Sequence, residues 1–295
     1  MADPDPDGAQ TSEMPERGGA ALTTGLTTLA MLAFAGNSLL CRLALAHANM
    51  DPATFTVIRL GAGALVLWLL CRTSRSRRTT GSWGSAVALL AYAACFSFAY
   101  VSLTAATGAL LLFGAVQATM IVSGLLAGER LRVVQWCGFG IAVVSLLALL
   151  APGVAAPDLL GACLMLAAGA AWGAYSLAGR GATDPLAMTA GNFTRAALMA
   201  LPLMMLAGGS WTTQGVVFAV LSGALASGVG YAIWYRALSD LTAARAATVQ
   251  LSVPIIAALG GVAILGEAFT TRLLVASLAM LLGIGLVMQG RFARR

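Results

Sequence analysis

Long apolar segments follow one another along almost the entire chain, and this pattern constrains the fold more than any other feature. They lie near residues 23–45, 54–71, 83–103, 105–127, 133–151, 159–179, 186–207, 215–237, 243–265 and 271–290. A helix needs about 20 apolar residues to cross roughly 30 Å of hydrocarbon. We therefore expect an all-α integral membrane protein with ten transmembrane helices and no sizeable domain outside the bilayer.

The low content of charged residues excludes a soluble fold. Only 9% of the residues are charged, whereas globular proteins carry about 25% to solvate their surfaces. Residues 1–20 are acidic and rich in proline, with little to bury, which predicts a disordered tail. This stretch is not typical of a cleaved signal peptide, because a signal peptide begins with a basic region.

The arginines predict how the chain is oriented in the membrane. If the N-terminus faces one side, the loops on that side hold most of the arginines, whereas the other side has only Arg42 and Arg272 at helix ends. Basic loops stay in the cytoplasm. We therefore expect a multi-pass protein of a bacterial inner membrane with both termini in the cytoplasm.

The two halves of the chain, residues 21–155 and 156–295, resemble each other. "AYVSLTAATGA" joins the third and fourth segments, and the related "WYRALSDLTAARAA" joins the eighth and ninth. A Gly-Glu pair ends the fourth segment at Glu129 and the ninth at Glu267. Each half has five segments, so the second half must enter the membrane from the opposite side. The pattern thus predicts inverted repeats with a site at their interface.

These motifs resemble those of the drug/metabolite transporter superfamily, EamA type, over about residues 22–290. Among its branches the chain is most similar to the bacterial aromatic amino acid exporters. The resemblance implies export of amino acids or similar small metabolites by alternating access around a central cavity. One departure is that the fourth segment lacks the mid-span proline of many members, whereas the ninth keeps Pro254. The fifth and tenth helices carry few polar residues and could pack against a second copy in a homodimer.

The sequence has no pattern typical of an enzyme. The single histidine, His47, lies in a predicted loop, and no HExxH, GxSxG or clustered carboxylates occur. Hydrolytic chemistry needs such a base or such metal ligands. The five cysteines have neither zinc-ligand nor redox spacing. We expect no catalytic residues, metal, cofactor or nucleic-acid partner.

The carboxylates lie outside the predicted spans. Beyond the tail they occur only at predicted loops or helix ends, as Asp51, Glu129, Asp158, Asp184, Asp240 and Glu267. Proton- and sodium-coupled carriers usually place a carboxylate or a histidine within a span, so we predict uncoupled facilitated transport or exchange. We expect Glu129 to pair with Arg130 or Arg132, and Glu267 with Arg272, as structural anchors.

Polar and aromatic residues inside the spans are candidates for a substrate cavity. An amide or hydroxyl at membrane depth needs a partner, either a neighbouring helix or a substrate, and both alternatives remain open. Trp172 and Tyr175 share one helix face because they are spaced i, i+3. The candidate cavity residues are Asn37, Tyr92, Gln117, Trp172, Tyr175, Ser227, Tyr231, Gln250 and Ser252.

A second group of residues is placed to act as gates or hinges. Each arginine near a span either contacts a substrate carboxylate or a gate, or snorkels to the lipid headgroups. The tyrosines of this group are gates or anchors in the aromatic belt. The candidate gate or mouth residues are Arg42, Arg59, Tyr100, Arg195 and Tyr235. The candidate hinge residues are Gly36, Gly173 and Pro254.

Several functions remain compatible with these features. Aromatic rings, amides and hydroxyls suit a neutral solute with a polar end, such as an amino acid. A drug or another metabolite is an alternative cargo of the same fold, although nucleotide sugars would need several basic residues in the cavity. A channel or a membrane scaffold is an alternative of a different class, but neither requires two related halves.

Overall fold

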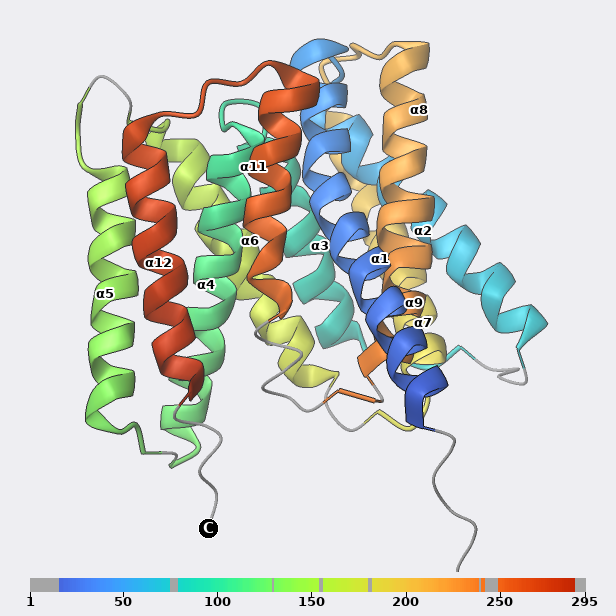
Figure 1. The fold of residues 1–295 in the computed structure, drawn as a ribbon. Coiled ribbons are helices and arrows are strands. Elements are labelled where there is room, and N and C mark those ends of the chain that lie inside the picture. Colours follow the sequence, from blue (N-terminus) through green and yellow to red (C-terminus); the bar gives the residue numbers. More distant parts are fainter. Residues whose placement is uncertain are drawn as a thin grey trace, which may run out of the picture.

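The computed structural model of the protein is a bundle of helices (Figure 1). It describes residues 16–74, 79–128, 130–153, 156–179, 182–238, 240–241 and 249–289, and all regular structure in these ranges is helical. The elements are α1 (Glu16–Arg42), η1 (Leu43–His47), α2 (Pro52–Thr73), α3 (Trp83–Ala99), α4 (Ala105–Leu126), α5 (Val133–Leu150), α6 (Leu159–Ala178), α7 (Pro185–Ala200), η2 (Leu201–Leu206), α8 (Thr213–Leu221), η3 (Ser222–Val229), α9 (Gly230–Leu238), α11 (Ser252–Leu265) and α12 (Thr271–Gln289).

These elements form the ten helices that the sequence predicted. Six helical segments are long and apolar enough to cross a bilayer: 21–47, 52–73, 105–126, 133–150, 159–178 and 213–238. Three shorter apolar helices, α3, α11 and α12, and the helix formed by α7 and η2 complete the set in the described ranges. The prediction of an all-helical, multi-pass membrane protein is therefore confirmed for this part of the chain.

Carboxylates begin several helices instead of lying inside them. Asp51, Asp158 and Asp184 each accept a hydrogen bond from a backbone N–H in the first turn of α2, α6 and α7, respectively. The first N–H groups of a helix have no partner within the helix, so an aspartate at this position stabilises the helix start. At these three residues the caps explain why the charge lies at the ends of the spans.

The ninth apolar segment is not one continuous helix, contrary to the expectation for residues 243–265. Leu251 interrupts the helical pattern, and α11 begins at Ser252 with Pro254 in its first turn. Proline is tolerated there because the backbone N–H that it lacks would have no partner in the helix. α11 has 14 residues and spans only about 21 Å. Residues 242–248 lie outside the described ranges.

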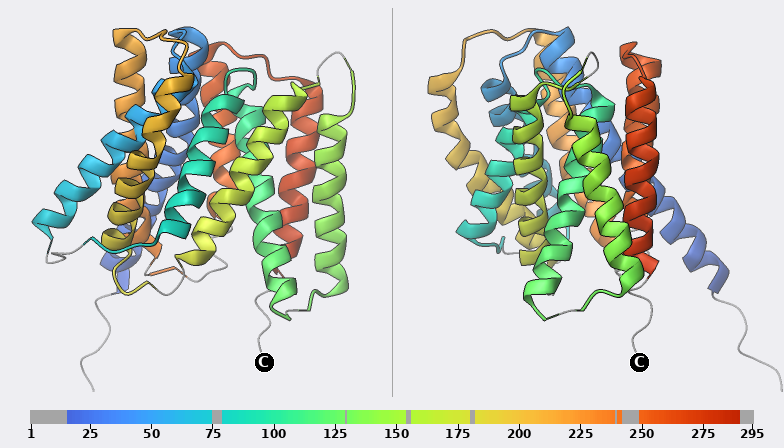
Figure 2. Two further views of the ribbon diagram at one scale, coloured as in Figure 1. Left: turned by 180° about the vertical axis from the view of Figure 1, so that it is seen from behind. Right: turned by 90° about the vertical axis from the view of Figure 1, so that its left-hand side faces the viewer.

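The helices pack in a pattern that repeats between the halves. α6 lies against α3 and α4, while α1 lies against the α8–η3–α9 helix and α11. α2 pairs with α7, and α5 pairs with α12 at one edge of the bundle (Figures 1 and 2). Each helix of the first half has a counterpart five helices later in the chain. The main contacts between helices are the same when every helix is replaced by its counterpart.

The helices run between two ends of the bundle, which correspond to the two faces of the membrane. The start of α1 and the end of α12 lie at the same face (Figure 1), which we call the termini face. The ends of η1, α3, α5 and α11 and the starts of α2, α4, α6 and α12 lie at the other face, which we call the opposite face. α1 and α6 run in opposite directions between these faces.

We expect Gly283→Ala in α12 to destabilise the protein by about 1–3 kcal/mol, because added volume in a closely packed contact forces the helices apart. A Cβ atom on Gly283 would lie 2.6 Å from the carbonyl oxygen of Gly138 on α5. Gly285→Ala is the matched control, since its Cβ atom would meet nothing within 4 Å. Thermal unfolding in detergent measures both changes. Equal melting temperatures for the two variants would contradict the prediction.

Candidate functional site

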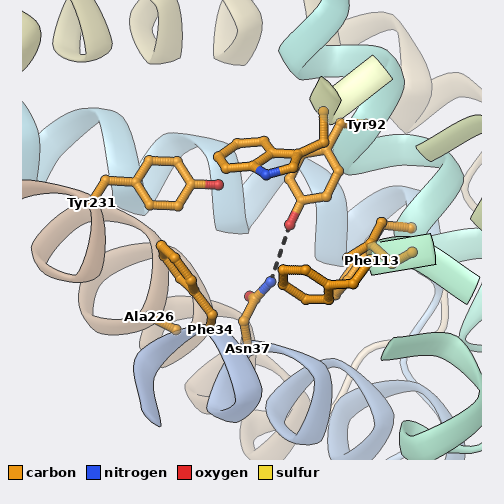
Figure 3. A pocket seen from close by; sticks show the side chains of 9 residues that line it. Phe34, Asn37, Tyr92, Phe113, Ala226 and Tyr231 are labelled. Carbon is orange, nitrogen blue, oxygen red and sulfur yellow. Dashed lines mark hydrogen bonds between the residues drawn. The ribbon is translucent and has the colours of Figure 1, made fainter. Parts of the chain in front are cut away.

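A small cavity lies where six elements of the bundle meet. Its lining residues are Phe34 and Asn37 from α1, Tyr92 and Phe96 from α3, Leu112 and Phe113 from α4, Trp172 from α6, Ala226 from η3 and Tyr231 from α9 (Figure 3). Its volume is about 20 Å³, which is room for about one water molecule. Four of the residues predicted from the sequence therefore meet here: Asn37, Tyr92, Trp172 and Tyr231.

Aromatic rings form most of the cavity wall. The Trp172 ring centroid lies 5.0 Å from that of Tyr92 and 5.0 Å from that of Tyr231. On the same helix, the rings of Trp172 and Tyr175 stack with an interplanar angle of 26°. Phe34 packs edge-on against Tyr231 from the other side. Such pairs contribute about 0.5–1.5 kcal/mol each beyond area burial, so they hold α1, α3, α6 and α9 around one apolar centre.

A chain of hydrogen bonds crosses the same region. The Asn37 side-chain nitrogen donates to the Tyr92 hydroxyl at 3.3 Å (Figure 3), and the Ser222 hydroxyl donates to the Asn37 side-chain oxygen at 2.6 Å. Arg59 donates to the same Tyr92 hydroxyl at 2.9 Å. The chain joins α2, α3 and α1 in the first half to η3 in the second half. The first half thus contacts the second through polar groups as well as rings.

Arg59 is buried in the protein and does not reach the headgroups. Only 2% of its surface is exposed, and its guanidinium carbon lies 5.2 Å from the ring centroid of Tyr92 and 4.8 Å from that of Phe96. Its Nε and Nη1 atoms have no hydrogen-bond acceptor among the described residues. The snorkelling alternative therefore does not apply to Arg59, which lies beside the central cavity and not at a mouth.

Arg42 ties four helix ends together at the opposite face. Its Nε atom pairs with Glu267 Oε1 at 3.0 Å, and its Nη1 atom donates to the backbone carbonyls of Tyr100 and Val101. The other Glu267 oxygen accepts from the backbone N–H of Ala105 at 2.8 Å. These contacts join the ends of α1, α3 and α11 to the start of α4. At this face they connect the first half of the chain to the second.

The expected pairing of Glu267 with Arg272 is wrong. Arg272 instead donates to the backbone carbonyls of Ala148 and Ala151 at the end of α5. Glu267 lies in the connection after α11, where the end of α1 brings Arg42 within reach. The expected pairing of Glu129 cannot be compared, because Glu129 lies outside the described residues.

Arg195 lies away from the cavity. It donates to the backbone carbonyl of Thr80 at 2.8 Å, and its guanidinium carbon lies 5.6 Å from the ring centroid of Trp83. It therefore fastens the connection between α2 and α3 onto α7. The backbone of the same connection also donates from Ser82 to the Asn192 side-chain oxygen.

The predicted tyrosines differ in their surroundings. Tyr100 is fully buried, and its hydroxyl donates to the backbone carbonyl of Ala105 at 3.3 Å, so it packs inside the bundle instead of anchoring in a belt. The Tyr175 hydroxyl accepts a long hydrogen bond of 3.4 Å from Asn192. Tyr235 is partly buried on α9 and packs against the core.

The remaining candidate cavity residues do not line the cavity. Gln117 is buried on α4, and Gln250 is half-buried before α11. The Ser252 hydroxyl donates to the backbone carbonyl of Val249 at 2.6 Å. Ser227 is buried on the π-helical η3, and its hydroxyl has no partner among the described residues. π-Helical turns are frequent at functional sites, so η3 is a notable neighbour of the cavity.

The candidate hinges lie in three different environments. α1 and α6 are regular helices at Gly36 and Gly173. A Cβ atom on Gly173 would lie 2.9 Å from the Thr119 Cβ atom, whereas one on Gly36 would meet nothing within 4 Å. Gly173 is therefore needed for the close contact between α6 and α4. Pro254 marks the point where α11 begins.

Five lining residues were not predicted from the sequence: Phe34, Phe96, Leu112, Phe113 and Ala226. Apolar side chains in a membrane helix have the same character whether they face lipid, core or cavity. Helical spacing carried a usable signal for three of them, because Phe34, Phe96 and Phe113 lie three or four residues from Asn37, Tyr92 and Gln117, respectively, and thus on the same helix faces.

Comparison with known proteins provides the family context. The sequence profile of the EamA-like transporter family matches the chain twice, over residues 23–151 and 159–289. A protein of Pseudomonas aeruginosa, described as uncharacterized, is 53% identical over 285 residues, which cover 95% of this chain and 98% of that protein. A crystal structure of a protein with 18% identity matches with a TM-score of 0.64 over 91% of this chain and 98% of the other. This last match bears on the fold alone.

We expect Glu267→Gln to loosen the opposite face, because an ion-paired hydrogen bond contributes about 1.5–3 kcal/mol. Cys41 is fully buried beside Arg42 and serves as the reporter. In detergent, a variant with Cys41 as its only cysteine should react with a maleimide about tenfold faster after the change, since about 1.4 kcal/mol corresponds to a factor of ten.

The matched control for this labelling experiment is Asp240→Asn, which removes an exposed ion pair with Arg236 near the termini face. It should leave the labelling rate of Cys41 unchanged. If Glu267→Gln also leaves that rate unchanged, the Arg42–Glu267 pair does not hold this face closed.

Proposed function

The chain belongs to the EamA-like transporter family, and from this premise we propose that it exports amino acids, aromatic ones among them, across the bacterial inner membrane by alternating access. The observation that carries the proposal is the central cavity, where aromatic rings surround a chain of polar groups. The rings suit an aromatic or apolar side chain, and the amide and hydroxyl groups suit a polar end.

We further propose that residues 21–155 and 156–295 form two inverted repeats. The family profile matches once within each of these ranges. The helix contacts are preserved when each helix is exchanged for its counterpart in the other half, and α1 and α6 run in opposite directions. Carriers built from inverted repeats place their substrate between the repeats. The cavity is lined by helices from both halves, which supports this location for the site.

The size of the cavity supports a mechanism with moving halves. A space for about one water molecule does not hold an amino acid. The helices around it must therefore separate before a substrate can enter. At the opposite face, the Arg42–Glu267 pair is the candidate gate that must open. Toward the termini face, an open surface groove is lined by Ala118, Thr119, Val122, Ser123 and Leu126, all on α4.

We also propose an orientation of the protein in the membrane and a driving force for transport. The arginine-rich loops support a cytoplasmic location for the termini face. The carboxylates cap helices or form ion pairs at the described helix ends and lie outside the central cavity. A site without a carboxylate supports transport driven by the substrate gradient alone.

Counterflow in proteoliposomes tests the proposed substrate. In vesicles that contain the full chain and unlabelled phenylalanine, we expect saturable uptake of labelled phenylalanine. Tryptophan should compete, whereas glutamate should not. Uptake without saturation, accompanied by a steady ion current, would identify a channel, and absence of counterflow with every amino acid would overturn the proposed cargo.

A pair of tryptophan variants links counterflow to the cavity. Trp172→Ala should raise the half-saturating concentration of phenylalanine about fivefold, because a ring contact worth about 1 kcal/mol is lost. Trp136→Ala is the matched control, since Trp136 is exposed on α5. If both variants raised the half-saturating concentration equally, this cavity would not be the site that binds the transported solute.

We expect transport in the same vesicles to be independent of proton and sodium gradients. An imposed pH gradient or sodium gradient should leave the initial rate of uptake unchanged, because neither a carboxylate nor a histidine is among the described residues that line the cavity. Uptake that depends on a pH gradient and collapses when a protonophore is added would contradict this prediction.

A further inference from the structure

The guanidinium of Arg59 is a buried positive charge whose hydrogen-bonding capacity is largely unused. A guanidinium has five N–H donors and carries its charge at all relevant pH values. Among the described residues only its Nη2 atom finds an acceptor, the Tyr92 hydroxyl. Nε and Nη1 are buried without an acceptor among the described residues. Burying an ion without a counter-charge is costly, so this group is well suited to bind an anion.

No described carboxylate is placed to neutralise Arg59. Glu267 pairs with Arg42 at the opposite face, and Asp240 pairs with Arg236 near the termini face. The other carboxylates whose side chains the structure describes are Asp51, Asp158 and Asp184, which cap α2, α6 and α7. The rings of Tyr92 and Phe96 cover the guanidinium and offset part of the cost by cation–π attraction, but neither ring supplies a negative charge.

A single hydrogen bond connects the Arg59 guanidinium to a residue that lines the cavity. Its partner, the Tyr92 hydroxyl, also accepts from Asn37, and both of these residues line the cavity (Figure 3). The rings of Tyr92 and Phe96, which lie over the guanidinium, are also part of the cavity wall. An anionic group that entered the widened cavity would therefore reach Arg59 while the rest of the molecule met Trp172 and Tyr231.

We propose that Arg59 binds the carboxylate of the transported solute and thereby restricts the cargo to carboxylates with an aromatic or apolar side chain. The inference rests on the proposed function and identifies the Arg59 guanidinium as the protein group that selects the solute. Guanidinium and carboxylate match in a charge-assisted, two-point geometry. An amine of the same shape without the carboxylate would leave Arg59 unpaired and add a second positive charge, so it would be rejected.

A binding experiment on the unmodified full chain tests this selection without any variant. Thermal unfolding in detergent is measured with 3-phenylpropionate, phenylalanine, phenylalaninamide and phenethylamine. We expect the first two to raise the melting temperature and the last two to have no effect. Equal stabilisation by phenethylamine and 3-phenylpropionate would overturn the proposal, and so would the absence of stabilisation by both carboxylates, whatever counterflow shows.

Substitutions in α2 then test whether Arg59 is the residue that binds the carboxylate. Arg59→Gln should weaken binding of 3-phenylpropionate at least about tenfold, because a group built to bind the carboxylate is lost. Arg59→Lys should restore part of the binding, since it keeps the charge. Arg72→Gln is the matched control: Arg72 is exposed on the same helix and lies over the Trp68 ring. Unchanged binding in a folded Arg59→Gln protein, or an equal loss in Arg72→Gln, would refute the assignment.

Different results would refute the proposed aromatic cargo and the proposed role of Arg59. If phenylalanine and phenethylamine show equal counterflow, the transport of aromatic solutes stands and the role of Arg59 is wrong. If no amino acid shows counterflow but 3-phenylpropionate still stabilises the wild type and not Arg59→Gln, the cargo is wrong and the carboxylate site stands.

Discussion

The need to satisfy polar groups at membrane depth is the constraint on which the centre of this structure depends. Hydrocarbon offers no water to bind, so buried polar groups need partners within the protein. Here the Tyr92 hydroxyl accepts from both Arg59 and Asn37, and Asn37 in turn accepts from Ser222. One hydroxyl therefore sets the relative positions of α1, α2 and α3 and connects them to η3. The unused donors of Arg59 are the part of this network that remains open to a ligand.

Close packing and local ties hold the rest of the bundle around this network. Small residues such as Gly173 and Gly283 let helices approach until their backbones nearly touch. The Arg42–Glu267 pair joins helix ends from both halves at the opposite face. The centre is thus held by ring contacts and one polar chain, whereas the opposite face is held by a partly exposed ion pair. The proposed mechanism requires this ion pair to exchange its partner for water.

Much of the fold and part of the site followed from the sequence. The number of helices was predictable because apolar length and the thickness of a bilayer decide it. Asn37, Tyr92, Trp172 and Tyr231 were predictable because polar or amphipathic side chains at mid-span are unusual. Leu112 and Ala226 resembled any other apolar residue of a membrane helix, so helical spacing from a candidate polar residue did not separate them from residues that face lipid.

The sequence by itself determined that the chain lies in a membrane, how many helices it forms, and that the carboxylates of the described residues lie at helix ends rather than within the spans. These properties depend on the residues of one segment at a time. Only the tertiary structure decided that Arg59 points inward instead of toward the headgroups, and that Glu267 pairs with Arg42, which lies 225 positions away in the sequence. The direction in which a side chain points depends on the rotation of its helix and on neighbours from distant parts of the chain, and a single segment carries no information about either.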